Sequence, residues 1–307
     1  MGLLRRAVFV AAAASLAACA GQFQPPRAAA GAPIVCRGVV DGDGRPMPVD
    51  RIHWDLLSET DDRERLDLSC GAVGPAVVAG PEGAATAVRA AMDDVVVVTW
   101  NMHGDAGELP ALVNSIRTGG PGQPPRPHVV MLLQEAFRAS PLVPATIPIE
   151  AAVPRAVRTR EEPRDDLVAV ARALDMHLVY VPSMRNGRGP GPTGSEDRGN
   201  AILATLPLSD LAAIELPPAR HRRVAVAATV SGADAAGRAW RMRVATLHLD
   251  TVSTWRRLYL FSSQHRARQA SRVISVLGDA APLVLGADLN TWADGPAEPA
   301  VTRLPAQ

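Results

Sequence analysis

The sequence predicts an α/β fold in which two β-sheets pack face to face and helices cover the outside. From residue 84 onward, short apolar runs typical of buried strands alternate with segments that have the spacing of amphipathic helices. The chain also has ample material for a core, because 47% of its 307 residues are apolar. This length suits one large domain or two small ones.

Apolar periodicity and turn residues define the expected elements. Val95–Trp100 and Val129–Leu133 are continuous apolar runs, the pattern of strands buried on both faces. The predicted strands are Ile52–Leu57, Val95–Trp100, Val129–Leu133, His177–Val181, Ala201–Thr205, Arg223–Val230, Trp240–Leu249 and Pro282–Gly286. The predicted helices are Ala84–Met92, Glu108–Arg117, Asp165–Leu174 and Leu258–Leu277. The Gly-rich segment Asn186–Arg198 is expected to be a loop.

The N-terminus predicts export. Residues 1–18 combine two arginines, an apolar run and small residues, which is the pattern of a secretory signal peptide. The segment Leu-Ala-Ala-Cys that ends at Cys19 is similar to the lipobox of bacterial lipoproteins. This resemblance implies a lipid anchor on Cys19 and a place in the cell envelope, at the outer membrane facing the periplasm. The alternative is an ordinary signal peptide cut near Ala18. Residues 19–33 are rich in Pro, Ala and Gly and predict a flexible tether.

Residues 34–83 are expected to form an N-terminal extension, followed by the main domain over residues 84–307. The extension contains Cys36 and Cys70, and two cysteines in an exported chain usually form a disulfide. Such a bond would stabilise the fold by roughly 3–4 kcal/mol. A metal site is the less favoured alternative. The Asp-Gly-Asp-Gly stretch at 41–44 predicts a solvated turn, because the ligand spacing of a calcium loop is absent.

Polar residues with phosphate or metal chemistry follow several predicted strands, where α/β folds place active sites. A carboxylate at the end of an apolar strand is costly to bury unless it is paired or bound to metal. Each candidate, taken singly, could equally be an ordinary turn or strand-end residue. The candidates are Asn101 in WNMHG, Glu135 in LLQE, Asn200 in RGNAIL, His248 in THLD, and Asp288 and Asn290 in GADLN.

Taken in this order, the segments resemble the motifs of the endonuclease/exonuclease/phosphatase superfamily over roughly residues 95–295. The resemblance implies a four-layer α/β/β/α sandwich of the deoxyribonuclease I-like type, with the site at one rim of the paired sheets. It also implies that Asn101 and Glu135 bind a metal ion, Mg²⁺ or alternatively Mn²⁺. The reaction implied is attack of water on a phosphoester of a nucleic acid, a lipid or a sugar phosphate.

The remaining candidates match catalytic and substrate-binding positions of that superfamily. By this resemblance His248 contacts the scissile phosphate, and Asp288 orients or deprotonates the attacking water. Asn290 holds the phosphate through its amide, so it counts as both a catalytic and a substrate-binding residue. Asn200 lines the substrate site.

The family's last motif, a His paired with an Asp near the C-terminus, is missing, because residues 291–307 contain no His. We therefore expect a domain that is incomplete at its C-terminus, lacks the last strands and has impaired turnover. The alternative is a non-catalytic, envelope-anchored protein that binds phosphate or metal. The oligomeric state is open.

Charge does not select the substrate. The formal charge of +1 argues against a dominant polyanion-binding face. The cluster Arg220-His221-Arg222-Arg223 is expected to face solvent or a phosphate-bearing substrate, which keeps nucleic acid among the candidate substrates.

Overall fold

A computed structural model describes nine stretches of the chain: 35–81, 88–103, 108–120, 122–144, 166–185, 196–219, 221–251, 256–278 and 282–291. The predicted signal peptide, the tether and Cys19 lie outside these residues, as does most of the predicted loop Asn186–Arg198. Within the described part, no helix is both long and apolar enough to span a membrane.

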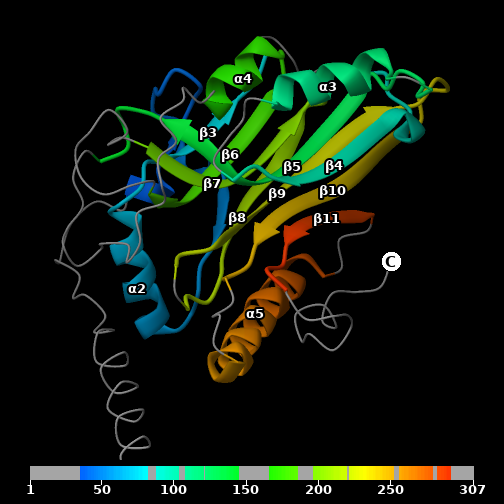
Figure 1. Cartoon of the computed structure of the whole chain (residues 1–307). Coiled ribbons are helices and arrows are strands. Elements are labelled where there is room, and N and C mark those ends of the chain that lie inside the picture. Colours follow the sequence, from blue (N-terminus) through cyan, green and yellow to red (C-terminus); the bar gives the residue numbers. More distant parts are fainter. Residues whose placement is uncertain are drawn as a thin grey trace, which may run out of the picture.

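Two β-sheets form the centre of the molecule (Figure 1). The six-stranded sheet has the order β1-β3-β6-β7-β5-β4, and the five-stranded sheet has the order β11-β10-β9-β8-β2. The strands are β1 (Val39–Val40), β2 (His53–Asp55), β3 (Ala76–Ala79), β4 (Val95–Asn101), β5 (His128–Ala139), β6 (His177–Arg185), β7 (Glu196–Ala204), β8 (Leu208–Glu215), β9 (Val224–Ala233), β10 (Ala239–His248) and β11 (Leu283–Asp288).

Three apolar layers hold the sheets and helices together. Successive side chains of β5 point to opposite faces, so Val130 and Leu132 pack between the sheets while Met131 packs outward. The outer face of the six-stranded sheet is covered by α3 (Leu109–Thr118) and α4 (Leu167–Ala173). The outer face of the five-stranded sheet is covered by α5 (Arg256–Leu277). The predicted α/β/β/α sandwich is therefore confirmed.

The predicted N-terminal extension is built into both sheets. It supplies β1 and β3 to one edge of the six-stranded sheet and β2 to an edge of the five-stranded sheet. The predicted disulfide is present: Cys36 and Cys70 are bonded, with their Cα atoms 5.0 Å apart. It joins the 3-10 turn η1 (Val35–Arg37) to the end of α2 (Thr60–Cys70). The disulfide therefore joins two elements of the N-terminal segment, shortly before the paired edge strands β1 and β3.

Some elements differ from the prediction. The predicted helix Ala84–Met92 is wrong where it is described, because residues 88–90 run beside β9 and a 3-10 turn, η3 (Met92–Asp94), follows. Helix α2 was not predicted, since its buried residues Leu66 and Cys70 give too short an apolar stripe. Strand β8 was also not predicted, because its alanines and its Ser-Asp pair have low strand propensity.

Candidate functional site

The candidate residues lie where strands of the two sheets end at the same rim. In the six-stranded sheet, β4 and β5 run parallel, so Asn101 at the end of β4 is paired in register with Gln134 and lies beside Glu135. In the five-stranded sheet, β10 and β11 also run parallel, and His248 is in register with Asp288. Parallel pairing brings the carboxyl ends of neighbouring strands together, which is where α/β folds place ligand sites.

Contacts across the two sheets join these pairs. The Nδ2 of Asn101 donates a hydrogen bond to Oδ2 of Asp288 at 2.5 Å. The Nδ1 of His248 lies 3.6 Å from Oε1 of Glu135. Residues predicted to bind metal therefore meet residues predicted to be catalytic, although neither sheet alone contains both sets.

The conformation of Glu135 departs from regular strand geometry. The pairing of β5 with β7 shifts between Leu133 and Ala136, which marks a β-bulge, and Glu135 has a positive φ of 51°. Leu133 and Ala136 both pack against the outer apolar layer. The extra residue in the bulge interrupts the regular alternation of side chains between the two faces of the sheet. The Glu135 side chain therefore points toward Arg198 and His248. Such a strained backbone in a non-glycine residue is common at functional sites.

Two more residues at this rim have the same strained backbone. His103 has a φ of 49° and Asn290 a φ of 50°. His103 follows β4, and its backbone N–H donates to Oδ1 of Asn101 at 3.0 Å. Asn290 follows β11, and its backbone N–H donates to Oδ1 of Asp288 at 2.9 Å. The two strained residues therefore fix the side chains of Asn101 and Asp288 through short local turns.

A hydrogen-bond chain orients His248. The Nδ2 of Asn290 donates to the carbonyl of Leu249 at 2.9 Å, and it lies 2.7 Å from Nε2 of His248. Because a carbonyl only accepts, Nδ2 is the amide nitrogen, and its second N–H points to Nε2. The imidazole therefore accepts at Nε2 and carries its proton on Nδ1, which faces Glu135.

Burial keeps His248 neutral. Its side chain is only 3% exposed. Burial lowers its pKa well below the usual histidine value, and the nearby charges of Arg223 and Arg198 lower it further. A neutral ring with its proton on Nδ1 can donate one hydrogen bond into the site.

Three residues at the rim were not among the predicted site residues. Arg198 belongs to the RGNAIL segment, in which only Asn200 was a candidate, and its Nη1 donates to Oε2 of Glu135 at 2.6 Å. Arg223 was expected to face solvent or substrate as part of a basic cluster, but its side chain is only 4% exposed. Gln134 donates from Nε2 to Thr246 at 2.9 Å and so bonds one sheet to the other. Sequence patterns identify such partners on other strands only when the order of the strands and the packing of the sheets are known.

Asn200 has a positioning contact. It is buried, and its Nδ2 donates to the carbonyl of Val224 at 2.6 Å, directly after Arg223. Gly199 beside it touches the neighbouring strand so closely that a Cβ would lie 2.0 Å from the carbonyl oxygen of Val181. These residues border a small recess that is also lined by Glu135, Arg198, Arg223 and His248.

The donor atoms fit Mg²⁺ or Mn²⁺ in kind. The carboxylate of Glu135 and the amide oxygen of Asn101 are hard oxygen donors, and Mg²⁺ is usually bound by one or two carboxylates together with water and substrate oxygens. Among the described residues, no cluster of three or more His, Cys, Asp or Glu could form an all-protein cage. The bulge that points the Glu135 carboxylate into the site supports such a role.

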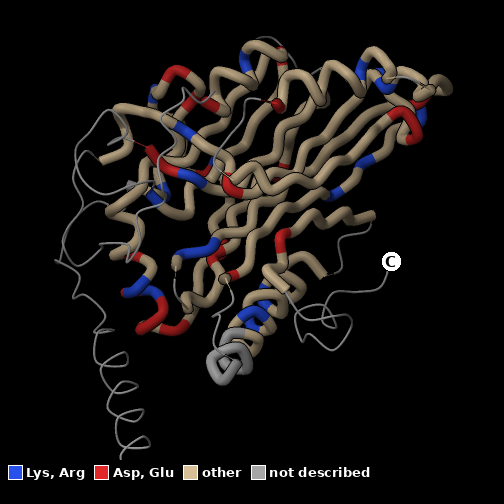
Figure 2. Tube along the Cα trace, in the orientation of Figure 1, with Lys and Arg blue, Asp and Glu red and all other residues tan. Residues whose placement is uncertain are grey.

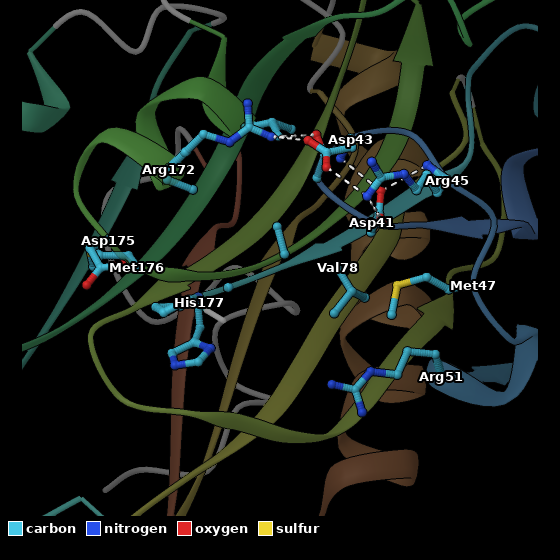
Figure 3. A pocket seen from close by; sticks show the side chains of 16 residues that line it. Asp41, Asp43, Arg45, Met47, Arg51, Val78, Arg172, Asp175, Met176 and His177 are labelled. Atoms are coloured by element: carbon cyan, nitrogen blue, oxygen red, sulfur yellow. Dashed lines mark hydrogen bonds and ion pairs between the residues drawn. The ribbon is translucent and has the colours of Figure 1, made fainter. Parts of the chain in front are cut away.

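A wider recess lies elsewhere, between the turn at residues 41–45, the end of β3 and the start of β6 (Figure 3). The Oδ1 of Asp41 accepts from the backbone N–H groups of Asp43 and Arg45, both at 2.9 Å, so the predicted turn is confirmed. Asp43 also pairs with Arg45 at 3.1 Å and with Arg172 at 2.6 Å. The charged side chains that line this recess are thus largely paired with one another. None of the candidate site residues lines it.

Charged residues of both signs are spread over the chain, and most residues of the strands are uncharged (Figure 2). The predicted basic cluster does not form a continuous exposed stripe in the described residues. Arg222 is fully buried and bonded to Glu215, and the side chain of Arg223 is only 4% exposed. The described part therefore presents no dominant basic face.

No protein-family model matches the chain, and no curated protein matches it. Among solved structures, an endonuclease/exonuclease/phosphatase from Beutenbergia cavernae matches at 21% identity with a TM-score of 0.42, covering 66% of this chain and 50% of that one. The human Nocturnin catalytic domain with bound sulfate matches at 18% identity with a TM-score of 0.39, covering 67% and 66%. The 3' phosphatase NExo from Neisseria, bound to product DNA, matches at 20% identity with a TM-score of 0.35, covering 63% and 57%.

The chain thus spans half to two thirds of the length of these solved structures, with 50%, 66% and 57% of each covered. At these identities the likeness concerns the fold. The chemistry of this site has to be inferred from its own residues.

Proposed function

We propose that this protein is a metal-dependent phosphoester hydrolase, as its motifs' resemblance to the endonuclease/exonuclease/phosphatase superfamily implies. The observation that carries the proposal is the convergence of all the candidate residues at one rim of the sandwich. They come from segments as distant as Asn101 and Asn290. Unrelated turn and strand-end residues would have no reason to meet across two sheets, so their shared location argues against separate structural explanations.

In this proposal Glu135 and the amide oxygen of Asn101 hold Mg²⁺ or Mn²⁺. The bound ion would stabilise the charge that develops on the phosphoryl oxygens. Asp288 orients the attacking water and accepts its proton. Its carboxylate is fixed by hydrogen bonds from Asn101 and from the Asn290 backbone, yet 28% of its side chain remains exposed, so water can reach it.

His248 and Asn290 would act together on the phosphate. Neutral His248 donates from Nδ1 to a phosphoryl oxygen, where donors aimed at developing charge lower the barrier most. Asn290 holds the ring through Nε2 and thereby keeps the proton on Nδ1. Asn200 supports the wall of the recess through its bond to Val224.

The test is hydrolysis of bis(p-nitrophenyl) phosphate and p-nitrophenyl phosphate by the purified full chain, with Mg²⁺, with Mn²⁺ and with EDTA. Glu135→Gln and Asp288→Asn should each lower the metal-dependent rate by about 100- to 1,000-fold. Asp210→Asn is the matched control, because Asp210 also has a positive φ, of 47°, but pairs with Arg241 on the surface. Equal rates in wild type, Glu135→Gln and Asp288→Asn would overturn the proposal.

A binding-only protein is the second candidate, and one observation favours it. Each predicted metal ligand already has a protein partner, since Glu135 pairs with Arg198 and Asn101 bonds to Asp288. Thermal unfolding with and without Mg²⁺ separates the two, because an ion that binds only the folded state raises the midpoint. A raised midpoint without turnover supports binding alone, and a raised midpoint with Glu135-dependent turnover supports the hydrolase.

The substrate is proposed only as a phosphoester, of a nucleic acid or of a lipid or sugar phosphate. The salt dependence of binding distinguishes these classes. Contacts with several nucleic-acid phosphates release counterions, so affinity for a DNA oligonucleotide should fall steeply with salt. A single phosphate headgroup should show a much weaker dependence.

We also propose that the protein is held at the cell envelope by a lipid on Cys19, on the evidence of the lipobox-like sequence. Metabolic labelling with a palmitate analogue should mark the wild-type chain and not Cys19→Ser. Equal labelling of both chains would contradict the anchor.

A further inference from the structure

Two arginines face the same small recess from opposite sheets. Arg198 lies on β7 of the six-stranded sheet, and Arg223 directly precedes β9 of the five-stranded sheet. Glu135 and His248 line the same recess. The side chains of Arg198 and Arg223 are 14% and 4% exposed, so both charges are largely withdrawn from water.

The hydrogen bonding of both arginines is incomplete. Arg198 donates from Nη1 to Glu135, but its buried Nε has no hydrogen-bond partner among the described residues. The Nε of Arg223 lies 3.5 Å from Asp250 and likewise makes no hydrogen bond. Leaving buried donors unpaired is unfavourable. Other arginines of the described chain have an unpaired Nε as well, but Arg198 and Arg223 have it at one shared recess beside the candidate site.

The two guanidinium groups also repel each other. Burial lowers the pKa of Arg198, Glu135 raises it, and the charge of Arg223 lowers it again. Like charges brought together out of water favour the binding of an anion between them. A guanidinium is planar and donates in a fork, which matches the oxygens of a phosphate group.

We propose that Arg198 and Arg223 bind the phosphate group of the substrate, and that Arg198 exchanges Glu135 for phosphate when Glu135 ligates a divalent cation. This inference rests on the proposed location of the phosphate and metal sites. Arg223 is the fixed member of the pair, because Asp250 and the Asn200–Val224 hydrogen bond hold it in place. Arg198 is the mobile member, because the one side-chain hydrogen bond that it makes to the described residues is to Glu135, which the cation requires.

The exchange couples the two ligands. While Arg198 is bonded to Glu135, neither the carboxylate nor the guanidinium is fully available. When Glu135 ligates a cation, the guanidinium of Arg198 is released and can then bind phosphate. Each ligand should therefore strengthen the binding of the other by the same factor, as linkage requires.

Isothermal titration calorimetry of the full chain with inorganic phosphate, with and without Mg²⁺, measures this coupling without turnover. In the wild type, Mg²⁺ should tighten phosphate binding by about 5- to 100-fold. Arg223→Met should weaken phosphate binding by about 10- to 100-fold at any Mg²⁺ concentration. Arg198→Met should bind Mg²⁺ more tightly than wild type, and its phosphate affinity should no longer depend on Mg²⁺.

Two further variants control for indirect effects. Arg198→Lys keeps a charge and should retain part of the coupling. Arg172→Met removes an exposed arginine outside the recess and should change neither the phosphate affinity nor its dependence on Mg²⁺. Wild-type phosphate affinity in both Arg198→Met and Arg223→Met, or no phosphate binding by the wild type at millimolar concentration, would overturn the inference.

The outcomes for this inference and for the hydrolase differ. If phosphate binding depends on the arginines but no phosphoester is hydrolysed, the inference stands and the hydrolase proposal fails. If Glu135-dependent hydrolysis occurs but phosphate affinity is unchanged in Arg198→Met and Arg223→Met, the hydrolase proposal stands and the inference fails.

Discussion

The buried arginines of the sandwich differ in how completely they are bonded. In Arg138, Nε and Nη2 donate to Asp197, and Nη1 donates to the carbonyl of Pro75 at 2.7 Å. In Arg222, Nε and Nη2 donate to Glu215, and Nη1 donates to Pro182 at 2.5 Å. Arg198 makes a single hydrogen bond, and Arg223 makes an ion pair without a hydrogen bond among the described residues.

This difference separates structural charge from charge that is available to a ligand. The sequence contains no lysine, so arginine has to serve both purposes. A guanidinium whose nitrogens are all bonded within the protein has nothing left to offer a ligand, and its role is to hold backbone and carboxylate in place. A guanidinium with free donors in a recess beside carboxylate and histidine is suited to an anion. Substituting a fully bonded arginine should therefore lower the free energy of unfolding more than substituting an arginine with free donors.

The largest effect is expected from Arg222→Met. Both Arg222 and its partner Glu215 are fully buried, with 0% of each side chain exposed. Removing the guanidinium leaves the buried Glu215 charge without its hydrogen-bonded partner and, among the described residues, with only Nε of Arg37 nearby, at 3.9 Å, which costs about 3–5 kcal/mol. Urea unfolding measures the loss. The double variant Arg222→Met/Glu215→Leu should regain most of the stability, and a single variant as stable as wild type would break the comparison.

A smaller loss is expected from Gly199→Ala, which tests how the recess wall is held. The added Cβ would lie 2.0 Å from the carbonyl oxygen of Val181 and 2.7 Å from Cα of Pro182, so backbone has to move. Overpacking of this kind costs about 1–3 kcal/mol. Because Arg198 and Asn200 flank Gly199, phosphate affinity should fall as well. Gly237→Ala is the control for steric crowding, since nothing lies within 4 Å of a Cβ at that position. Its φ of 78° adds a separate cost in backbone strain.

The sequence predicted the layers and the site better than the edges of the sheets. Continuous apolar runs such as Val95–Trp100 identified the central strands, because those strands are buried on both faces. Strand β2 was predicted, within Ile52–Leu57. Strands β1, β3 and β8 were not predicted, since β1 contains only two residues and β8 is rich in alanine. Short edge strands form because a sheet is already present to pair with, which local propensity does not reveal.

The same limit explains which site residues were found. Asn101, Glu135 and His248 were predicted because each follows an apolar strand in a recognisable segment. Arg198 and Arg223 each pair with a residue on a neighbouring strand of their own sheet, and that partner is known only once the order of the strands is known. The bulge that turns Glu135 into the site has no local signal in Leu-Leu-Gln-Glu either.

Arg223→Met should cost less stability than Arg222→Met, although the two residues are adjacent. The substitution removes the ion pair with Asp250, which lowers stability, and the repulsion from Arg198, which raises it. We expect a net loss of about 1 kcal/mol in urea unfolding. Phosphate affinity should nevertheless fall far more in Arg223→Met than in Arg222→Met. Equal stability losses in the two variants would show that Arg223 is structural, like its neighbour.

The smallest effect is expected from Arg172→Met, which extends the comparison to the recess of Figure 3. Arg172 pairs with Asp43 at 2.6 Å, but the two side chains are 65% and 51% exposed. Water screens such a pair, and holding two mobile side chains together costs entropy, so the change in unfolding free energy should stay below about 0.5 kcal/mol. High salt should leave the difference between variant and wild type near zero. A loss above about 1 kcal/mol would mean that this turn stabilises the sheet edge. The number of hydrogen bonds that an arginine makes would then not be enough to identify it as structural.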